Sequence, residues 1–203
     1  TDLSFPEEAL YKSITDDTKA LVIVNPNNPT GTPVKRDVII RFLEKMGERL
    51  VLIDEAYFEF FGETVIDLID TYKNLVVLRT FSKSFGMAGI RLGTVVSHSD
   101  NIAHMTKAHS PYSISGITVK LAMAGMDDKA FVEKYASEIR ENRDVLLAEL
   151  RSVGLEVFPS SCNFLLIRFG KSAQKITDSL RTEGILARDQ SAAPLLEGCV
   201  RVT

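Results

Sequence analysis

Short, continuously apolar runs that alternate with a stretch of helical periodicity constrain the fold more than any other feature of the sequence. The four apolar runs lie at residues 20–24, 50–53, 75–78 and 92–96. Between the first two, residues 35–46 carry apolar side chains at the spacing of one helix face. Apolar runs without alternation are typical of strands that are covered on both faces. We therefore predict an α/β fold with a mostly parallel sheet and helices on both faces.

The second half of the sequence is organised differently, with a long helix followed by short strands. The helices predicted from apolar spacing lie at 117–126, 129–153 and 173–182. The predicted short strands lie at 155–158, 163–169, 185–187 and 200–203. This pattern predicts a small C-terminal α+β lobe. We place the large domain at 1–128, and the connecting helix with the lobe at 129–203.

The composition is that of an ordinary folded protein. Hydrophobic residues make up 45% of the 203 residues and charged residues 25%, which argues against disorder. The formal net charge is −3, so overall charge gives no reason to expect nucleic-acid binding. Every apolar run is shorter than the roughly 20 residues that a membrane span needs. We expect a cytoplasmic protein that binds neither nucleic acid nor membrane.

Both ends of the sequence suggest a piece of a longer polypeptide. It begins at Thr1 without a methionine and ends at Thr203, within an alternating run that predicts a strand. The two cysteines, Cys162 and Cys199, fit neither a disulfide framework nor a four-ligand zinc site. Since no base is in view beside it, Cys162 is interpreted as a small buried hydrophobic residue.

Polar clusters follow three of the predicted strands, and this placement points to a site. They span residues 28–31, 54–57 and 80–91. Each cluster alone has an ordinary interpretation, namely a turn, a helix cap or a solvated charge. Ligands of open parallel sheets bind beyond the carboxyl ends of the strands, so the order and placement of the clusters favour a shared site.

The motifs in these clusters resemble those of one enzyme family. They are NPNNPTG at 25–31, DEAYFEF at 54–60, TFSKSFGMAGIRLG at 80–93, SxxNF at 160–164 and RVT at 201–203. The sequence resembles the pyridoxal-phosphate-dependent aminotransferases of the aspartate-aminotransferase fold, and most closely their histidinol-phosphate aminotransferase branch. The resemblance covers nearly the whole chain and corresponds to the central and C-terminal part of the family. It implies pyridoxal 5'-phosphate as the cofactor.

The resemblance also implies a role for each residue of the cofactor site. Lys83 would bond covalently to the cofactor and shuttle a proton during the reaction. Asp54 would pair with the pyridine nitrogen, and Tyr57 and Asn28 would hydrogen-bond the phenolic oxygen of the ring. The phosphate would be held by Thr80, Ser82 and Arg91.

Three further residues are implied on the substrate side. Arg201 would bind the anionic group of the substrate, and Arg188 would be a second anion-binding arginine. The alternative for each is a surface ion pair, which is the weaker interpretation for Arg201. Asn163 matches a residue near the substrate, or else its amide is satisfied by strand-end backbone. Ser113 and Ser115 stand where the branch commonly has asparagines, which leaves the exact substrate open.

The leading functional hypothesis is transamination between histidinol phosphate and 2-oxoglutarate by a homodimer. Aromatic amino-acid aminotransferases share the same cofactor motifs, and so do threonine-phosphate decarboxylases, in which the substrate loses carbon dioxide instead. The family's N-terminal segment, with its phosphate-binding glycine turn and stacking aromatic residue, has no counterpart in this sequence. A non-catalytic fragment that acts only as a folded module therefore stays as a third alternative.

Overall fold

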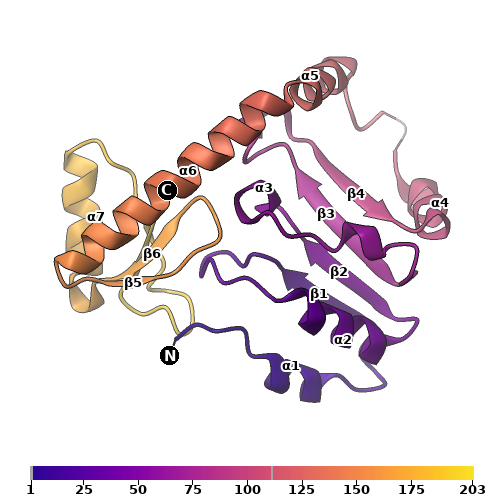
Figure 1. The fold of residues 1–203 in the computed structure, drawn as a ribbon, viewed down its shortest axis with the longest axis horizontal. Coiled ribbons are helices and arrows are strands. Elements are labelled where there is room, and N and C mark those ends of the chain that lie inside the picture. The colour runs from indigo at the N-terminus through magenta and orange to yellow at the C-terminus, as the bar shows by residue number, and fades with distance from the viewer. Residues whose placement is uncertain (1, 111) are drawn as a thin grey trace.

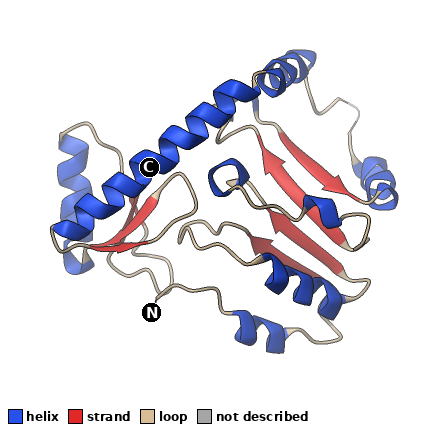
Figure 2. Ribbon diagram, in the orientation of Figure 1, coloured by secondary structure: helices blue, strands red, loops and turns tan. Residues whose placement is uncertain are grey.

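Two four-stranded sheets joined by one long helix make up the computed structural model, which describes residues 2–110 and 112–203 (Figures 1 and 2). The helices α1 and α2 lie beside the first sheet. The long helix α6 runs from α5 to the second sheet, which lies near its C-terminal end. The helices are α1 (Glu7–Ser13), α2 (Arg36–Met46), α3 (Phe58–Phe61), α4 (Ser99–Ala108), α5 (Gly116–Asp127), α6 (Lys129–Ser152) and α7 (Ala173–Thr182).

The first sheet has the order β1-β2-β3-β4. Its strands are β1 (Ala20–Val24), β2 (Leu50–Asp54), β3 (Leu75–Thr80) and β4 (Gly93–Ser97). The first three are parallel, whereas β4 runs antiparallel to β3. The four strands that the apolar runs predict are therefore present, and the sheet is mostly parallel as expected.

The core of this sheet lies between its strands and α2. The apolar residues of α2, among them Ile39 and Phe42, are fully buried against Ile23 and Ile53. The spacing of apolar side chains in 35–46 therefore forms the buried helix face that it predicts. On the opposite face of β1, Val22 is 61% exposed.

The second sheet is antiparallel throughout, with the order β5-β6-β8-β7. Its strands are β5 (Glu156–Phe158), β6 (Leu165–Arg168), β7 (Arg188–Asp189) and β8 (Cys199–Val202). Leu147 and Leu150 of α6 pack against β5 and β6. The predicted strand at 185–187 is wrong, because pairing with β8 begins at Arg188 and Leu186 is 81% exposed.

Three helices escape the sequence prediction, namely α1, α3 and α4. The helix α3 is four residues long, which is too short to show a helical period. No residue of α1 or α4 is fully buried, so neither has the apolar stripe that marks a helix in a sequence. The break between α5 and α6 falls at Asp128, whose carboxylate accepts a hydrogen bond from Phe131 N at 3.1 Å.

Within the described part of the chain, no helix combines the length and the apolar character that crossing a membrane requires.

Candidate active site

The strand register brings the three polar clusters to one edge of the first sheet. Val24, Asp54 and Leu78 are neighbours across the ends of β1, β2 and β3. Beyond them, Asn25 N donates to Asp54 O at 2.8 Å, and Glu55 N donates to Leu78 O at 2.9 Å. The loops that follow these strands therefore start side by side, as expected for carboxyl ends of parallel strands.

The loop after β1 is fixed from both sides. The buried Asn25 accepts a hydrogen bond from Val34 N at 2.7 Å, and Gly31 O accepts one from Ser161 N at 2.9 Å. Gly31 has a φ of +76°, and a Cβ added there would lie 2.8 Å from the Cα of Ser160. Only glycine fits this close approach, which joins the loop to the segment that precedes β6.

Three of the predicted cofactor residues converge at this edge. Asn28 Nδ2 donates to the hydroxyl oxygen of Tyr57 at 3.2 Å, and Tyr57 itself is buried. Lys83 Nζ lies 5.1 Å from the centroid of the Tyr57 ring. An amine, a phenol and an amide from three separate loops thus share one location.

Arg201 joins the group from the second sheet. From β8, its Nη1 donates to Asn28 Oδ1 at 2.7 Å, and its guanidinium carbon lies 5.1 Å from the centroid of the Phe164 ring. That ring in turn packs edge-on against Tyr57, with centroids 5.4 Å apart. Arg201 Nε is buried and has no hydrogen-bond partner among the described residues, so one donor of this guanidinium is left unpaired.

Asp54, Thr80 and Ser82 are half-buried at the same strand ends. Asp54 Oδ1 accepts a hydrogen bond from Ala56 N at 3.0 Å, which orients the carboxylate. Thr80 Oγ1 accepts from Ser82 N at 3.1 Å, so the two hydroxyl residues lie in one turn ahead of Lys83.

The remaining predicted residues are less closely joined to this group. Arg91 is exposed, with a φ of +54°, and its guanidinium donates to Ala88 O at 2.8 Å. Arg188 is also exposed and stands directly opposite Arg201 in the β7–β8 pair. Asn163 lies half-buried and directly precedes Phe164 in the chain.

The long helix α6 holds loops from both parts of the site. Arg140 Nη1 donates to Glu59 O at 2.9 Å, and Arg143 Nη1 donates to Cys162 O at 3.0 Å. Cys162, Phe164 and Tyr57 belong to one apolar cluster with Ala136 of α6. The loop before β6 and the helix α3 are therefore fixed to the same support.

The cysteines are not reactive groups of the site. Burial raises the pKa of the Cys162 thiol to about 12, although Arg143 and Arg201 act in the opposite direction. Cys162 is fully buried, which confirms its interpretation as a small hydrophobic residue.

Within the described residues, no cluster of three or more histidine, cysteine or acidic side chains could hold a metal ion.

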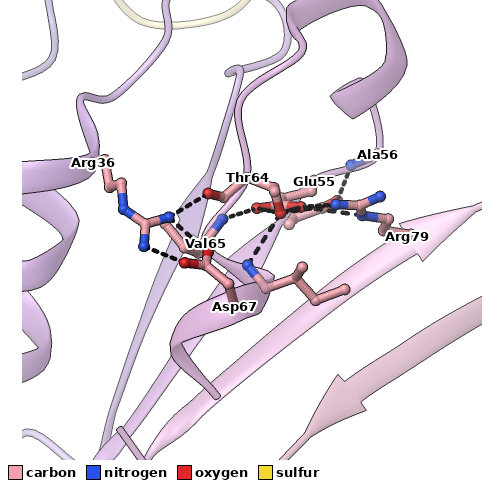
Figure 3. A network of polar contacts seen from close by, with 9 residues as sticks. Arg36, Glu55, Ala56, Thr64, Val65, Asp67 and Arg79 are labelled. Atoms are coloured by element: carbon pink, nitrogen blue, oxygen red, sulfur yellow. Dashed lines mark hydrogen bonds and ion pairs between the residues drawn. The ribbon is translucent and has the colours of Figure 1, made fainter. Parts of the chain in front are cut away.

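Sequence analysis missed Glu55 and Arg79, which form an ion pair at the ends of β2 and β3, with Glu55 fully buried and Arg79 half-buried (Figure 3). Glu55 stands inside the DEAYFEF motif, and Arg79 directly precedes the TFSKSFG motif. The available signal was a charged residue at the end of each of two neighbouring apolar strands. Such a signal becomes informative only once the strands are known to be adjacent.

The chain is similar in sequence to known aminotransferases. The sequence pattern of the family described as "Aminotransferase class I and II" matches residues 4–203. The chain is 39% identical to a histidinol-phosphate aminotransferase of Thermoanaerobacter pseudethanolicus over 186 residues, which covers 91% of this chain and 52% of the relative. The chain thus spans about half the length of the curated relatives it matches.

Two solved structures extend this likeness to the fold. Histidinol-phosphate aminotransferase from Sinorhizobium meliloti, in complex with pyridoxal-5'-phosphate, superposes with a TM-score of 0.87 at 28% identity, covering 97% of this chain and 56% of that one. L-threonine-O-3-phosphate decarboxylase from Porphyromonas gingivalis gives a TM-score of 0.85 at 26% identity, covering 98% and 63%. With the family pattern matched over nearly its whole length, the chain belongs to the class I and II aminotransferase family.

Proposed function

We propose that this chain carries the cofactor-binding and substrate-binding residues of a pyridoxal-phosphate-dependent aminotransferase. The observation that carries the proposal is the convergence of Lys83, Tyr57, Asn28 and Arg201 at the strand ends. The residues present fit the cofactor, because an amine, a phenol, a carboxylate and a guanidinium with a buried unpaired N–H meet at one edge. The family to which the chain belongs supports the same cofactor.

Each residue has a task that follows from its chemistry. Lys83 supplies the primary amine that bonds to the cofactor, and once free, it moves a proton from the Cα of the substrate. Asp54 provides the anion for the ring nitrogen, while Asn28 and Tyr57 provide donors for the phenolic oxygen. When bound, pyridoxal phosphate supplies an electron sink for the negative charge that develops at the substrate Cα.

Hydroxyl and guanidinium groups would bind the anionic groups of the cofactor and of the substrate. Thr80, Ser82 and Arg91 would hold the cofactor phosphate, since hydroxyls and a planar guanidinium are suited to phosphate oxygens. Arg201, whose Nε is unpaired among the described residues, would bind the anionic group of the substrate through its guanidinium. Arg188 and Asn163 would complete the substrate side.

The amino donor we favour is histidinol phosphate, with 2-oxoglutarate as acceptor, in a cytoplasmic homodimer with units at 1–128 and 129–203. The relatives named histidinol-phosphate aminotransferase, at 36–40% identity, support this substrate pair. The likeness to a threonine-phosphate decarboxylase favours that lyase as the second candidate. Both reactions start from the same site residues and differ in which bond at the Cα is broken.

A titration with pyridoxal phosphate, followed by substrate addition, tests the proposal. In the full polypeptide that carries these residues, a visible absorbance band should form and then bleach when histidinol phosphate is added. A band that responds to threonine phosphate with release of carbon dioxide would favour the lyase, and one that responds to an aromatic amino acid would favour that aminotransferase. Failure to form a band in the folded protein would leave a non-catalytic module.

A further inference from the structure

A fully buried carboxylate lies beside the site without belonging to it. The Glu55 side chain has no exposed surface, and its oxygens accept hydrogen bonds from four groups. Thr64 Oγ1 donates at 2.7 Å, Val65 N at 2.9 Å, and Arg79 donates through Nη2 at 2.8 Å and Nε at 3.1 Å (Figure 3). The carboxylate is therefore saturated with donors and has one fixed orientation.

Arg79 is fixed as firmly as its partner. Its guanidinium lies 3.5 Å from the centroid of the Phe58 ring, and its Nη2 also donates to Thr64 Oγ1 at 2.8 Å. A planar guanidinium that is stacked on a ring and paired through two nitrogens loses nearly all of its freedom to move. The ion pair is thus a rigid connection between the segment after β2 and the end of β3.

Both residues of the ion pair lie close in the chain to residues of the proposed cofactor site. Glu55 directly follows Asp54, and Arg79 precedes Lys83 by four residues. The backbone repeats the connection, since Glu55 N donates to Leu78 O. The pair therefore lies where the Asp54 loop and the Lys83 loop both leave the sheet.

Stability alone is a poor account of such a pair. Removing two charges from water is costly, and apolar residues of similar volume often replace a buried ion pair without loss of stability. By contrast, a site that must hold an acid and an amine on one ligand needs both held to within a fraction of an ångström. A rigid polar connection between the two loops meets this need.

We propose that Glu55 and Arg79 are positioning residues that set the placement of the Asp54 carboxylate relative to the Lys83 amine. The inference rests on the proposed function, because it concerns how these two groups meet pyridoxal phosphate. Neither residue is among those that would hold the cofactor. Each acts through the backbone, Glu55 through the adjoining Asp54 and Arg79 through the segment that leads to Lys83.

The first test titrates single variants of the full polypeptide with pyridoxal phosphate while the absorbance and circular dichroism of the bound cofactor are recorded. Arg79→Lys keeps the charge and loses the planar fork, whereas Glu55→Gln keeps an acceptor and loses the charge. We expect about tenfold weaker binding in each, as for residues that orient other ligand-binding groups. We also expect a smaller circular-dichroism band, because the cofactor is no longer held in one orientation.

A double variant separates positioning from stability. Glu55→Met combined with Arg79→Leu fills the space with apolar atoms and leaves no buried charge. We expect its urea midpoint without cofactor to lie closer to that of the parent than the midpoints of the two single variants do, while cofactor affinity and the dichroism band stay reduced. Recovery of all three quantities would show that the pair serves stability alone and would overturn the proposal. Each affinity is measured at a temperature where the variant's own unfolding curve shows it to be folded.

The matched control is Arg36→Lys. Arg36 pairs with Asp67 at 2.6 Å and also donates to Thr64 O, so it holds the same segment from the side away from the site (Figure 3). This variant should bind the cofactor like the parent. A loss equal to that of Arg79→Lys would also overturn the proposal, because any disturbance of residues 64–67 would then suffice.

The parent protein distinguishes this inference from the proposed function. If the folded parent does not bind pyridoxal phosphate, the proposed function fails. If the parent binds it, borohydride traps it on Lys83, and Arg79→Lys matches the parent in affinity and dichroism, then only the positioning role fails.

Discussion

The amide oxygen of Asn28 accepts a 2.7 Å hydrogen bond from Arg201, although the two residues are 173 positions apart in the chain. The amide nitrogen of the same side chain donates to the hydroxyl of Tyr57. One amide therefore connects the arginine of the second sheet with the tyrosine of the first. This connection makes the two ends of the site interdependent.

Arg201→Ala should raise KM for both the amino donor and the oxo acid by about 10- to 100-fold, because hydrogen bonds to charged groups contribute about 1.5–3 kcal/mol each. Steady-state kinetics with each substrate varied in turn checks this. Arg181→Ala, at an exposed position of α7, is the control and should leave both KM values unchanged. An increase for one substrate alone would contradict a shared anion site.

Asn28→Ala should weaken both cofactor binding and substrate binding, since the amide contacts both sides of the site. In a double-mutant cycle with Arg201→Ala, we expect a coupling free energy of about 1 kcal/mol in substrate binding. Strict additivity of the two changes would show that the hydrogen bond between them contributes nothing.

Lys83→Ala should abolish borohydride trapping of pyridoxal phosphate and lower turnover by more than about 100-fold, because no other amine replaces its proton transfer. Mass spectrometry of the trapped protein gives the first quantity. Lys107→Ala, in the exposed part of α4, should trap the cofactor normally. Near-normal turnover of Lys83→Ala would refute the assignment of this residue.

Gly31→Ala should destabilise the protein more than Gly62→Ala, although both glycines have positive φ values of +76° and +89°. The left-handed backbone costs about 1–2 kcal/mol in either variant. At Gly31 the new methyl group also overlaps Ser160, which adds about 1–3 kcal/mol, whereas nothing lies within 4 Å of Gly62. Urea unfolding measures the difference, and equal losses would mean that the loop moves aside freely.

Cys162 should lower the stability of the folded protein at high pH. Its folded-state pKa of about 12 lies above the ordinary value of 9.0, so unfolding releases a proton between pH 9 and about pH 12. The stability that comes with the protonated, buried thiol is fully present below pH 9 and is lost as pH rises towards about 12. The free energy of unfolding of Cys162→Ala, measured from pH 8 upwards, should therefore fall less steeply than that of the parent. Identical slopes would show that the thiol titrates normally when folded.

The sequence predicts the elements of this fold well where they bury apolar side chains. The strands β1 to β4 and the helices α2, α5, α6 and α7 all follow from apolar runs and spacing. Prediction fails at α1 and α4, which bury no residue fully, and at α3, which is only four residues long. It also fails at β7, a two-residue strand defined by its partner alone. The antiparallel direction of β4 likewise depends on a loop path that periodicity does not encode.

The candidate site likewise divides into residues that the sequence predicts and contacts that only the folded structure reveals. Lys83, Tyr57 and Asn28 are found from motifs at strand ends, and the structure brings them together. The Asn28–Arg201 contact spans almost the whole chain, so spacing cannot reveal it. The Glu55–Arg79 pair was missed because a charge in a sequence predicts solvent exposure, and its burial depends on a partner from the neighbouring strand.

Two of the arginines of α6 bind the backbone of neighbouring segments rather than the side chains there. Arg140 and Arg143 bind the main-chain carbonyl oxygens of residues 59 and 162, not their side chains. Every amino acid offers the same carbonyl group. A substitution at position 59 or 162 therefore leaves the acceptor atom in place, so α6 can keep holding the backbones of α3 and of the segment before β6 when these side chains change.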